Sequence, residues 1–329
     1  MSDTVNKSGS AVSLERASEL LRRAKNILII CHKHPDGDTL GSALGLRSVL
    51  SRIGVRAEVI CGDPPPPRFA FMTEIKSEPS PDFSPDLTVT VDVASTGLLG
   101  KLEEKYADKI DLKLDHHAVG APFAKENYVD AKAAGCGEII FELSKLLLED
   151  TLPKDAMDML YLAISADSGG FRFTNTTPRT LRIAAELMEA GADTAEINRI
   201  LFESRTPSEV RAISAAYSGM RYYLNGTAAL TVFTNEIKKE LDITDDDISA
   251  VSGLSREIAG VTLGMTLRQS SEDPGKYKLS LRTVAPVDAA FICSKLGGGG
   301  HVRAAGAEFA AASPEEAIQK VLCAAGVTL

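Results

Sequence analysis

Residues 27–42 read ILIICHKHPDGDTLGS, and this stretch decides the fold class. Its first five residues are apolar and rich in isoleucine, which predicts a buried strand. Leucines recur at roughly helical spacing from Thr39 to Leu50, which predicts a helix. The turn between the two carries His32, Asp36 and Asp38. In an open parallel sheet such turns lie at the carboxyl ends of strands, where these folds build their sites.

The tripeptide Pro35-Asp36-Gly37 is ambiguous by itself. Proline, aspartate and glycine are typical of surface turns, so the acids could simply be solvated. Gly37, however, lets the backbone bend sharply, so that Asp36 and Asp38 can point at one place. The choice between a plain turn and a site depends on where the other histidines and strand-end aspartates of the chain fall.

The pattern around this stretch predicts an α/β protein. Further strands are expected at 56–60, 87–93 and 110–114, and they alternate with helices expected at 137–148, 154–166 and from Pro178. Such alternation indicates a doubly wound, mainly parallel sheet. Later in the chain, a hairpin over 221–233, strands at 261–269 and 276–284, and a helix at 286–296 indicate a smaller α+β domain.

We therefore divide the chain into four parts. The first residues are polar and lack the apolar core of a signal peptide, so we expect a disordered tail. A weakly amphipathic helical segment interrupted by Pro207 is expected to connect the two domains. The expected parts are a tail at 1–10, a first domain at 11–192, a helical connector at 193–217 and a second domain at 218–329.

Composition excludes several classes of function. The chain has 329 residues and a formal net charge of -9. It lacks the field of Lys and Arg that binds a long nucleic-acid duplex, although a small phosphorylated substrate remains open if cations supply charge locally. No apolar run approaches the ~20 residues that span a bilayer, so no membrane association is expected. The five cysteines are scattered without a CxxC pair, which predicts a reducing, cytoplasmic location.

The distribution of histidines and aspartates decides between turn and site. All the histidines fall in short Asp- or Gly-rich turns after predicted strands or helices: His32, His34, His116, His117 and His301. Asp36, Asp38, Asp92 and Asp115 lie at or just past predicted strand ends, and Asp167 ends a helix that leads toward the same edge. Carboxylates gathered at one edge repel each other strongly unless cations lie between them.

This donor set predicts a metal centre. Histidine with carboxylate suits Mn²⁺ or another first-row ion better than an all-oxygen Mg²⁺ site, so Mn²⁺ is expected, with Mg²⁺ or Co²⁺ as alternatives. The donors suffice for two ions that share one aspartate. Two ions held ~3.5–4 Å apart are a common device for hydrolysing phosphate esters. The sequence therefore predicts a metal-dependent hydrolase.

The ordered motifs resemble those of the DHH phosphoesterase family, named for a tripeptide that here is Asp115-His116-His117. The resemblance covers His32-x-x-Pro35-Asp36-Gly37-Asp38-x-x-Gly41-Ser42, then Val91-Asp92, the tripeptide, and the run from Asp167 to Arg172. Near the end of the chain, Gly298-Gly299-Gly300-His301-x-x-Ala304-Ala305-Gly306 resembles the signature of the associated DHHA1 domain. The resemblance implies a catalytic DHH domain followed by a substrate-binding DHHA1 domain.

The resemblance also implies roles for these residues. One ion would be held by His32, Asp36 and Asp92, and the other by Asp38, Asp92, His116 and Asp167, with Asp92 bridging. Asp115 would orient an imidazole, as metal-bound histidines need. His117 would touch the substrate phosphate or protonate the leaving group. His34 stands where the family often has Asn and is expected to make a structural hydrogen bond, and Arg172 is open between packing and function.

In the second domain the resemblance implies a phosphate- and base-binding surface. The glycine run Gly298, Gly299 and Gly300 lets backbone N–H groups approach a phosphate, and His301 adds a donor. Ser280 and Arg282 share one face of a predicted strand, and Arg303 is expected to contribute in the same way. A hinge without a ligand is the alternative reading of the glycine run.

Size and domain pair are most similar to the nanoRNase/pAp phosphatase group of the family. The implied reaction releases 5′-mononucleotides from short oligoribonucleotides, with either polarity, or converts pAp to AMP. The alternative is a phosphodiesterase for cyclic or linear dinucleotides such as c-di-AMP and pApA. A nucleotide sensor without catalysis and a polyphosphatase are more remote readings. The resemblance leaves a homodimer open.

Overall fold

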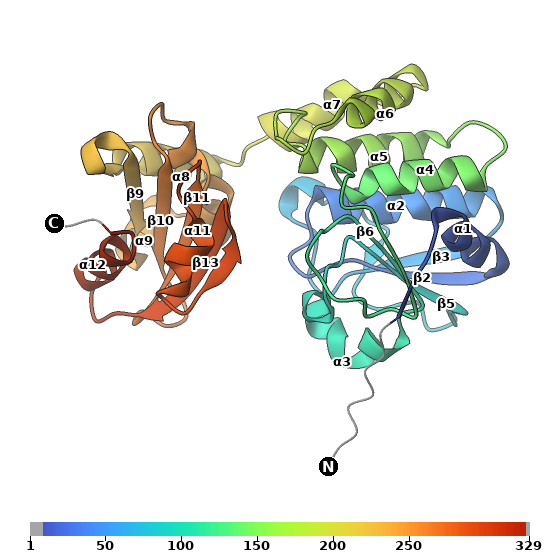
Figure 1. Cartoon of the computed structure of the whole chain (residues 1–329), viewed down its shortest axis with the longest axis horizontal. Coiled ribbons are helices and arrows are strands. Elements are labelled where there is room, and N and C mark those ends of the chain that lie inside the picture. Colours follow the sequence, from blue (N-terminus) through green and yellow to red (C-terminus); the bar gives the residue numbers. More distant parts are fainter. Residues whose placement is uncertain (1–8, 327–329) are drawn as a thin grey trace, which may run out of the picture. The chain divides into compact units, whose positions relative to one another are not determined.

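The computed structural model describes residues 9–326 and divides into two compact units, which are considered separately (Figure 1). The first unit ends at Ser204 and the second begins at Arg205. This boundary falls inside the segment 193–217 for which we expected a connector. Of the expected tail, residues 1–8 lie outside the described part of the chain, and Ser10 already begins a strand.

The first unit is built on a seven-stranded sheet in the order β1-β7-β6-β5-β2-β3-β4. Every neighbouring pair is parallel. The strands are β1 (Ser10–Ala11), β2 (Asn26–Ile30), β3 (Arg56–Ile60), β4 (Ile75–Lys76), β5 (Leu87–Val91), β6 (Leu112–Asp115) and β7 (Glu126–Val129). The predicted parallel sheet is confirmed.

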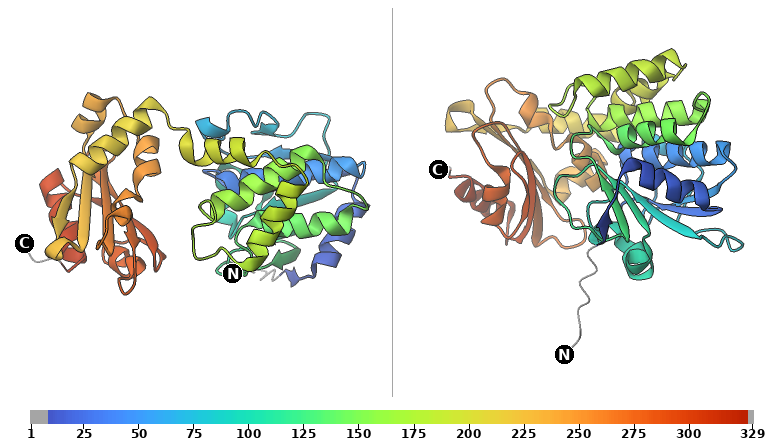
Figure 2. Two further views of the ribbon diagram at one scale, coloured as in Figure 1. Left: turned by 90° about the horizontal axis from the view of Figure 1, so that it is seen from above. Right: turned by 45° about the vertical axis from the view of Figure 1, so that its right-hand side comes forward.

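Helices cover both faces of this sheet, as a doubly wound fold requires (Figures 1 and 2). On one face lie α1 (Leu14–Arg23), α2 (Gly37–Arg52), α4 (Cys136–Leu147), α5 (Lys154–Asp167), α6 (Pro178–Glu189), α7 (Thr194–Asn198) and the π-helical turn η4 (Arg199–Glu203). On the other lie η2 (Thr96–Leu102), α3 (Glu103–Tyr106) and η3 (Ala107–Lys109). Alternate residues of β2 serve the two cores: Ile27 and Ile29 join one, and Leu28 and Ile30 join the other.

The turn at residues 32–36 leads directly into helix α2. Asp36 caps it by accepting hydrogen bonds from the backbone N–H groups of Asp38 and Thr39. Helix α5 approaches very closely, since a Cβ atom on Gly41 would lie 2.5 Å from the carbonyl oxygen of Met159. Glycine in α2 therefore places the ends of both helices near the carboxyl edge of the sheet.

The second unit is a six-stranded mixed sheet in the order β12-β13-β11-β10-β9-β8. Its strands are β8 (Arg221–Tyr223), β9 (Ala228–Phe233), β10 (Leu263–Gln269), β11 (Lys276–Thr283), β12 (Gly299–His301) and β13 (Ala304–Ala310). Its helices are α8 (Pro207–Ser218), α9 (Asn235–Leu241), α10 (Asp245–Val251), α11 (Ala289–Ser294) and α12 (Pro314–Ala324). The 3-10 turns not yet named are η1 (Pro67–Phe69) in the first unit and η5 (Leu224–Gly226) and η6 (Leu254–Glu257) in the second. The predicted α+β class and the hairpin β8–β9 are confirmed.

Several strands were not predicted from the sequence pattern. Neither β7 nor β13 shows a clear strand signal, because β7 (Glu-Asn-Tyr-Val) is short and half polar, and the alanine-rich β13 has no β-branched residue. The glycine run, read as a turn, contributes Gly299–His301 to strand β12, because β13 offers it a hydrogen-bonded partner. In the described part of the chain, no helix is long and apolar enough to cross a membrane.

Candidate metal centre

The carboxyl ends of β2, β5 and β6 bring the predicted ligands to one edge of the first sheet. These strands are neighbours in the order β6-β5-β2, so the residues that follow them meet. Candidate ligand atoms gather in three overlapping groups, in each of which the atoms lie within 4.8 Å of one another. The groups are His32, Asp36, Asp92; Asp38, His116, Asp167; and Asp92, His116, His117.

Asp92 lies at the centre of the cluster. Its Oδ2 is 3.4 Å from Nε2 of His32, and its Oδ1 is 3.3 Å from Nε2 of His116. The residue is buried and holds a φ of 60°, a left-handed conformation in which aspartate is enriched among non-glycine residues. One carboxylate therefore faces two imidazoles, which is the arrangement that a bridging ligand requires.

The two imidazoles are oriented by backbone carbonyl groups. Nδ1 of His32 donates to the carbonyl oxygen of Lys33 at 2.8 Å, and Nδ1 of His116 donates to that of Ala133 at 3.4 Å. Each Nε2 is thereby turned toward the carboxylates, which is the usual geometry of a metal-binding histidine. Oδ1 of Asp92 is buried and has no hydrogen-bond partner among the described residues. A cation between these groups would satisfy all of them.

Asp38 is held by the start of helix α4. Its Oδ2 accepts from the backbone N–H of Cys136 at 2.6 Å, and its Oδ1 accepts from that of Gly137 at 3.0 Å and from Oγ of Ser42 at 3.1 Å. Burial, together with the charges of Asp92 and Asp167, raises the pKa of the Asp38 carboxyl. The helix terminus fixes the carboxylate, while Oδ2 lies 3.7 Å from Nε2 of His116 in the cluster.

Asp36 and Asp167 complete the two groups. Oδ1 of Asp36 lies 3.7 Å from Nε2 of His32, and Oδ2 of Asp167 lies 3.8 Å from Nε2 of His116. Burial and the carboxylates of Asp92 and Asp36 raise the pKa of Asp167 to about 6, against the opposing charge of His116. The repulsion expected from the sequence is thus present, and a divalent cation would relieve it.

His117 and Asp115 form a separate pair. Nδ1 of His117 donates to Oδ1 of Asp115 at 2.8 Å, and this hydrogen bond raises the pKa of the imidazole. Asp115 is fully buried, and burial opposes its charge, but His117 and Lys113 lower its pKa to about 2. The imidazole that Asp115 orients is therefore that of His117, which is about one-third exposed.

Lys113 is a functional candidate that sequence reasoning missed. Its side chain is 2% exposed, and its Nζ lies 2.9 Å from Oδ2 of Asp115. A buried lysine that pairs with a buried carboxylate keeps that carboxylate ionised. The available signal was a lysine between two leucines of an apolar strand, on the same strand face as Asp115 two residues later.

In the second unit, the strand register collects four of the predicted substrate-binding residues. Arg282 and His301 both lie opposite Ala304, and Ser280 and Gly299 both lie opposite Gly306. Residues directly opposite each other in antiparallel strands share a face. Ser280, Arg282, Gly299 and His301 therefore share one face of the sheet β11-β13-β12.

Arg282 places a half-buried cation on this face. Its Nη1 donates to the carbonyl oxygen of Leu281 at 3.0 Å, and no carboxylate among the described residues pairs with it. Burial and the charge of Arg256 lower its pKa. A half-buried guanidinium group that pairs with no described carboxylate favours an anion as its ligand.

The remaining predicted substrate-binding residues of this unit, Gly298, Gly300 and Arg303, have structural roles in the backbone and its contacts. Gly298 allows a close backbone approach, because a Cβ atom there would lie 2.2 Å from the carbonyl oxygen of Gly306. Gly300 holds a φ of 140°, which favours glycine. Nη1 of Arg303 donates to the carbonyl oxygen of Val287 at 2.8 Å, so this side chain is already engaged.

Comparison with known proteins agrees with this geometry. Residues 26–164 match the model of the DHH family, N-terminal domain, and residues 227–325 match that of the DHHA1 domain. The bifunctional oligoribonuclease and PAP phosphatase NrnA of Thermus thermophilus is 33% identical over 309 residues, which cover 93% of this chain and 91% of that protein. The chain belongs to the DHH family.

This DHH protein is also similar to a more distant relative and to a solved structure. The cyclic-di-AMP phosphodiesterase GdpP of Bacillus subtilis is 25% identical over 92% of this chain, but the match covers only 48% of GdpP. The crystal structure of an exopolyphosphatase-related protein from Bacteroides fragilis has a TM-score of 0.86 at 23% identity and covers 94% of each chain. The second similarity shows the fold alone.

Two residues at the edge of this DHH site have local structural roles. His34 holds a φ of 52°, a left-handed conformation that is uncommon for residues other than glycine. Its backbone N–H donates to Asp63 at 3.0 Å, and its imidazole is 85% exposed. Nε of Arg172 donates to the carbonyl oxygen of Gly169 at 2.6 Å, and its guanidinium lies over the ring of Phe202.

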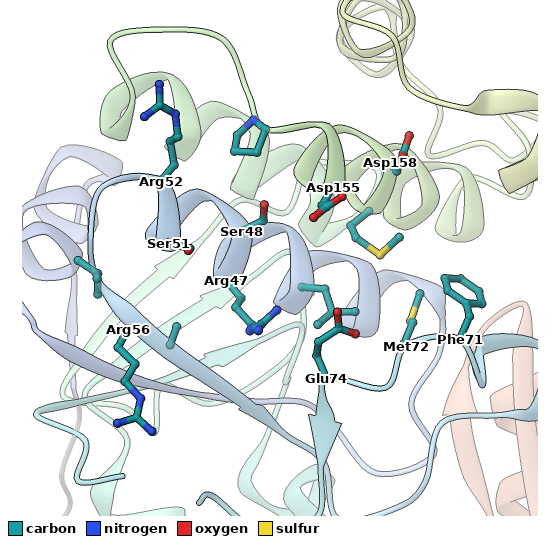
Figure 3. A pocket seen from close by; sticks show the side chains of 15 residues that line it. Arg47, Ser48, Ser51, Arg52, Arg56, Phe71, Met72, Glu74, Asp155 and Asp158 are labelled. Carbon is teal, nitrogen blue, oxygen red and sulfur yellow. The ribbon is translucent and has the colours of Figure 1, made fainter. Parts of the chain in front are cut away.

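A pocket of about 750 Å³ in the DHH unit lies apart from these residues (Figure 3). Residues of α2, α5, β3 and the loop before β4 line it, with cations and anions in equal number: Arg47, Arg52, Arg56, Glu74, Asp155 and Asp158. None of the predicted ligands borders it. The candidate site of this protein is therefore identified by its donor chemistry, and not by the size of a cavity.

Metal binding to this DHH site is expected to release protons. Burial opposes a charged imidazole, but the neighbouring carboxylates raise the pKa of His32 to about 11 and that of His116 to about 10. Both are therefore protonated at neutral pH without metal, and an ion must displace a proton from each. Apparent Mn²⁺ affinity should rise as the pH rises from about 6 to about 9. Calorimetry in two buffers of different ionisation enthalpy measures the released protons, and an affinity independent of pH would contradict the expectation.

Proposed function

We propose that this protein uses two Mn²⁺ ions to hydrolyse short oligoribonucleotides to 5′-mononucleotides and pAp to AMP. The observation that carries the proposal is the position of Asp92, whose two oxygens face the imidazoles of His32 and His116. The relative with 33% identity, named as an oligoribonuclease and PAP phosphatase over nearly the whole chain, supports the same substrates.

Different residues of the chain would bind the ions and transfer the proton. His32, Asp36 and Asp92 would hold one ion, and Asp38, Asp92, His116 and Asp167 the other. When bound, two such ions neutralise charge on the phosphoryl oxygens and activate the attacking water. His117 holds a proton that Nε2 can give to the leaving oxygen, because Asp115 accepts the hydrogen bond from Nδ1.

The face that carries Ser280, Arg282, Gly299 and His301 would bind a substrate phosphate. Glycine at 299 and 306 leaves room for a ligand above the strands, and Arg282 supplies a charge that no described carboxylate neutralises. A phosphate-binding surface besides the metal centre supports a substrate that carries more than one phosphate, as pAp and a cyclic dinucleotide do.

Turnover of a substrate panel in the presence of Mn²⁺ tests the proposal. The panel contains RNA dimers to pentamers, pAp, c-di-AMP and linear pApA. We expect rapid hydrolysis of pAp and of the shortest RNAs, with activity that falls as the RNA grows longer. A preference for c-di-AMP would favour the dinucleotide alternative. Metal binding without turnover of any member would overturn the proposal and leave a sensor or a polyphosphatase.

Replacing Arg282 by Met is expected to raise KM for pAp about 10- to 100-fold, because a hydrogen bond to a charged group contributes roughly 1.5–3 kcal/mol. The effect on kcat should be smaller, since the residue lies in the other unit from the metal ligands. Lys278→Met is the matched control, since Lys278 is exposed on the same strand face two residues before Ser280. Equal KM values for the two variants would contradict a phosphate-binding role.

A further inference from the structure

Asn175 joins two segments that carry metal ligands. It lies between α5 and α6, and its Nδ2 donates to the carbonyl oxygen of Ala134 at 2.8 Å and to that of Asp167 at 3.1 Å. The same Nδ2 lies 3.4 Å from Oδ2 of the Asp167 side chain. One amide thus contacts the backbone before α4 and both the backbone and the carboxylate at the end of α5.

The contact with Ala134 reaches Asp38 indirectly. Ala134 is followed by Gly135, Cys136 and Gly137, and the last two supply the backbone N–H groups that hold the Asp38 carboxylate. A Cβ atom on Gly135 would lie 2.9 Å from Oδ2 of Asp38, so the backbone here packs directly against this carboxylate. A shift of the start of α4 would move Asp38.

Asn175 is fixed from its own side by the segment that follows it. Thr177 caps α6 in a reciprocal capping box with Thr180. Nη1 of Arg179 donates to Asp130 at 2.5 Å, and its Nε lies 3.2 Å from the buried carboxylate of Glu138 in the first turn of α4. The segment 175–179 is therefore anchored to the start of α4 at two points.

The chemistry of the amide suits this place. Asp38 and Asp167 carry like charges around Nε2 of His116, and a neutral donor can hold Asp167 without competing with a cation for its charge. Oδ1 of Asn175 is buried without a hydrogen-bond partner among the described residues. An unpaired buried acceptor costs stability. The asparagine side chain therefore does not serve stability alone at this position.

We infer that Asn175 is a positioning residue for the ion held by Asp38, His116 and Asp167. Its amide sets the distance between the end of α5 and the start of α4, and thereby the separation of the two carboxylates. The Asn-Thr-Thr sequence, which formally matches a glycosylation pattern, serves this contact instead. This role rests on the proposed two-ion site, in which Asn175 supports the ion held by Asp38, His116 and Asp167.

The variants Asn175→Ala and Asn175→Asp test this role. Calorimetry measures the binding of Mn²⁺ to each full-length variant and to the wild type. We expect one of the two ions to bind about 10- to 100-fold more weakly in both variants, as is typical when a residue that orients a ligand is removed. The other ion should bind with unchanged affinity. The Asp variant keeps the shape but faces three acceptor oxygens, so it should be at least as impaired as the Ala variant.

Asn127→Ala is the matched control. Asn127 is also buried, and its Nδ2 donates to a backbone carbonyl, that of Ala124, at 2.8 Å, but it contacts no candidate ligand. Its loss should lower the thermal unfolding temperature and leave both Mn²⁺ affinities unchanged. Wild-type affinities for both ions in Asn175→Asp would overturn the inference alone. A wild-type protein that binds no pair of ions would overturn the proposed function together with it.

Discussion

Asp92→Asn is expected to reduce turnover of pAp and short RNA by roughly three orders of magnitude. The substitution keeps the shape of the side chain but removes the charge that faces both His32 and His116. Charge stabilisation by bound ions contributes several kcal/mol to such reactions, and each ~1.4 kcal/mol changes the rate tenfold. Steady-state kinetics at saturating Mn²⁺ measures the loss, and calorimetry should show that at most one ion still binds.

Asp86→Asn is the control for this variant. Asp86 accepts hydrogen bonds from the backbone N–H groups of Lys25 and Asn26, so it lies at the opposite ends of the same strands. Its replacement should lower the thermal unfolding temperature slightly and leave kcat unchanged. If Asp92→Asn kept wild-type turnover, a bridging role for Asp92 and the two-ion proposal would both be wrong.

His117→Ala is expected to lower kcat about 10²- to 10⁴-fold, the usual contribution of a general acid. Binding of both Mn²⁺ ions should persist, because the proposed ligand sets do not require His117. Its Nδ1 is engaged by Asp115 at 2.8 Å, which leaves Nε2 to deliver a proton to the leaving oxygen. The measurement is kcat for pAp together with an Mn²⁺ binding isotherm.

A substrate with a better leaving group separates acid catalysis from other roles of His117. A p-nitrophenyl ester of a nucleotide needs little protonation of its leaving oxygen, so the His117→Ala variant should lose much less activity on it than on pAp. An equal loss on both substrates would argue against proton transfer by His117. Loss of one Mn²⁺ ion would instead make His117 a ligand, which its place beside Asp92 and His116 also allows geometrically.

Local pattern was sufficient for those parts of the protein in which chemistry and spacing coincide. The apolar run before His32, the helical spacing after Asp38 and the strand before Asp115 predicted the parallel sheet, because strands buried on both faces are apolar throughout. The same turns predicted which side chains would meet, because parallel strands bring their carboxyl ends to a single edge.

Contacts between distant segments were outside the reach of such patterns. Lys113 beside Asp115 shows no signal beyond one lysine in an apolar strand, and its pairing depends on complete burial of that strand. Strands β7 and β13 form because a neighbouring strand offers hydrogen-bond partners, and their own composition does not favour strands.

The sequence by itself determined the fold class, the two-part organisation and the set of donors, because hydropathy period and residue chemistry are local properties. The tertiary structure alone decided which oxygen of Asp92 faces which imidazole, that α4 holds Asp38, and that Asn175 joins two ligand segments. Each of these depends on distances between residues far apart in the chain, and those distances are set by how α2, α4 and α5 pack on the sheet.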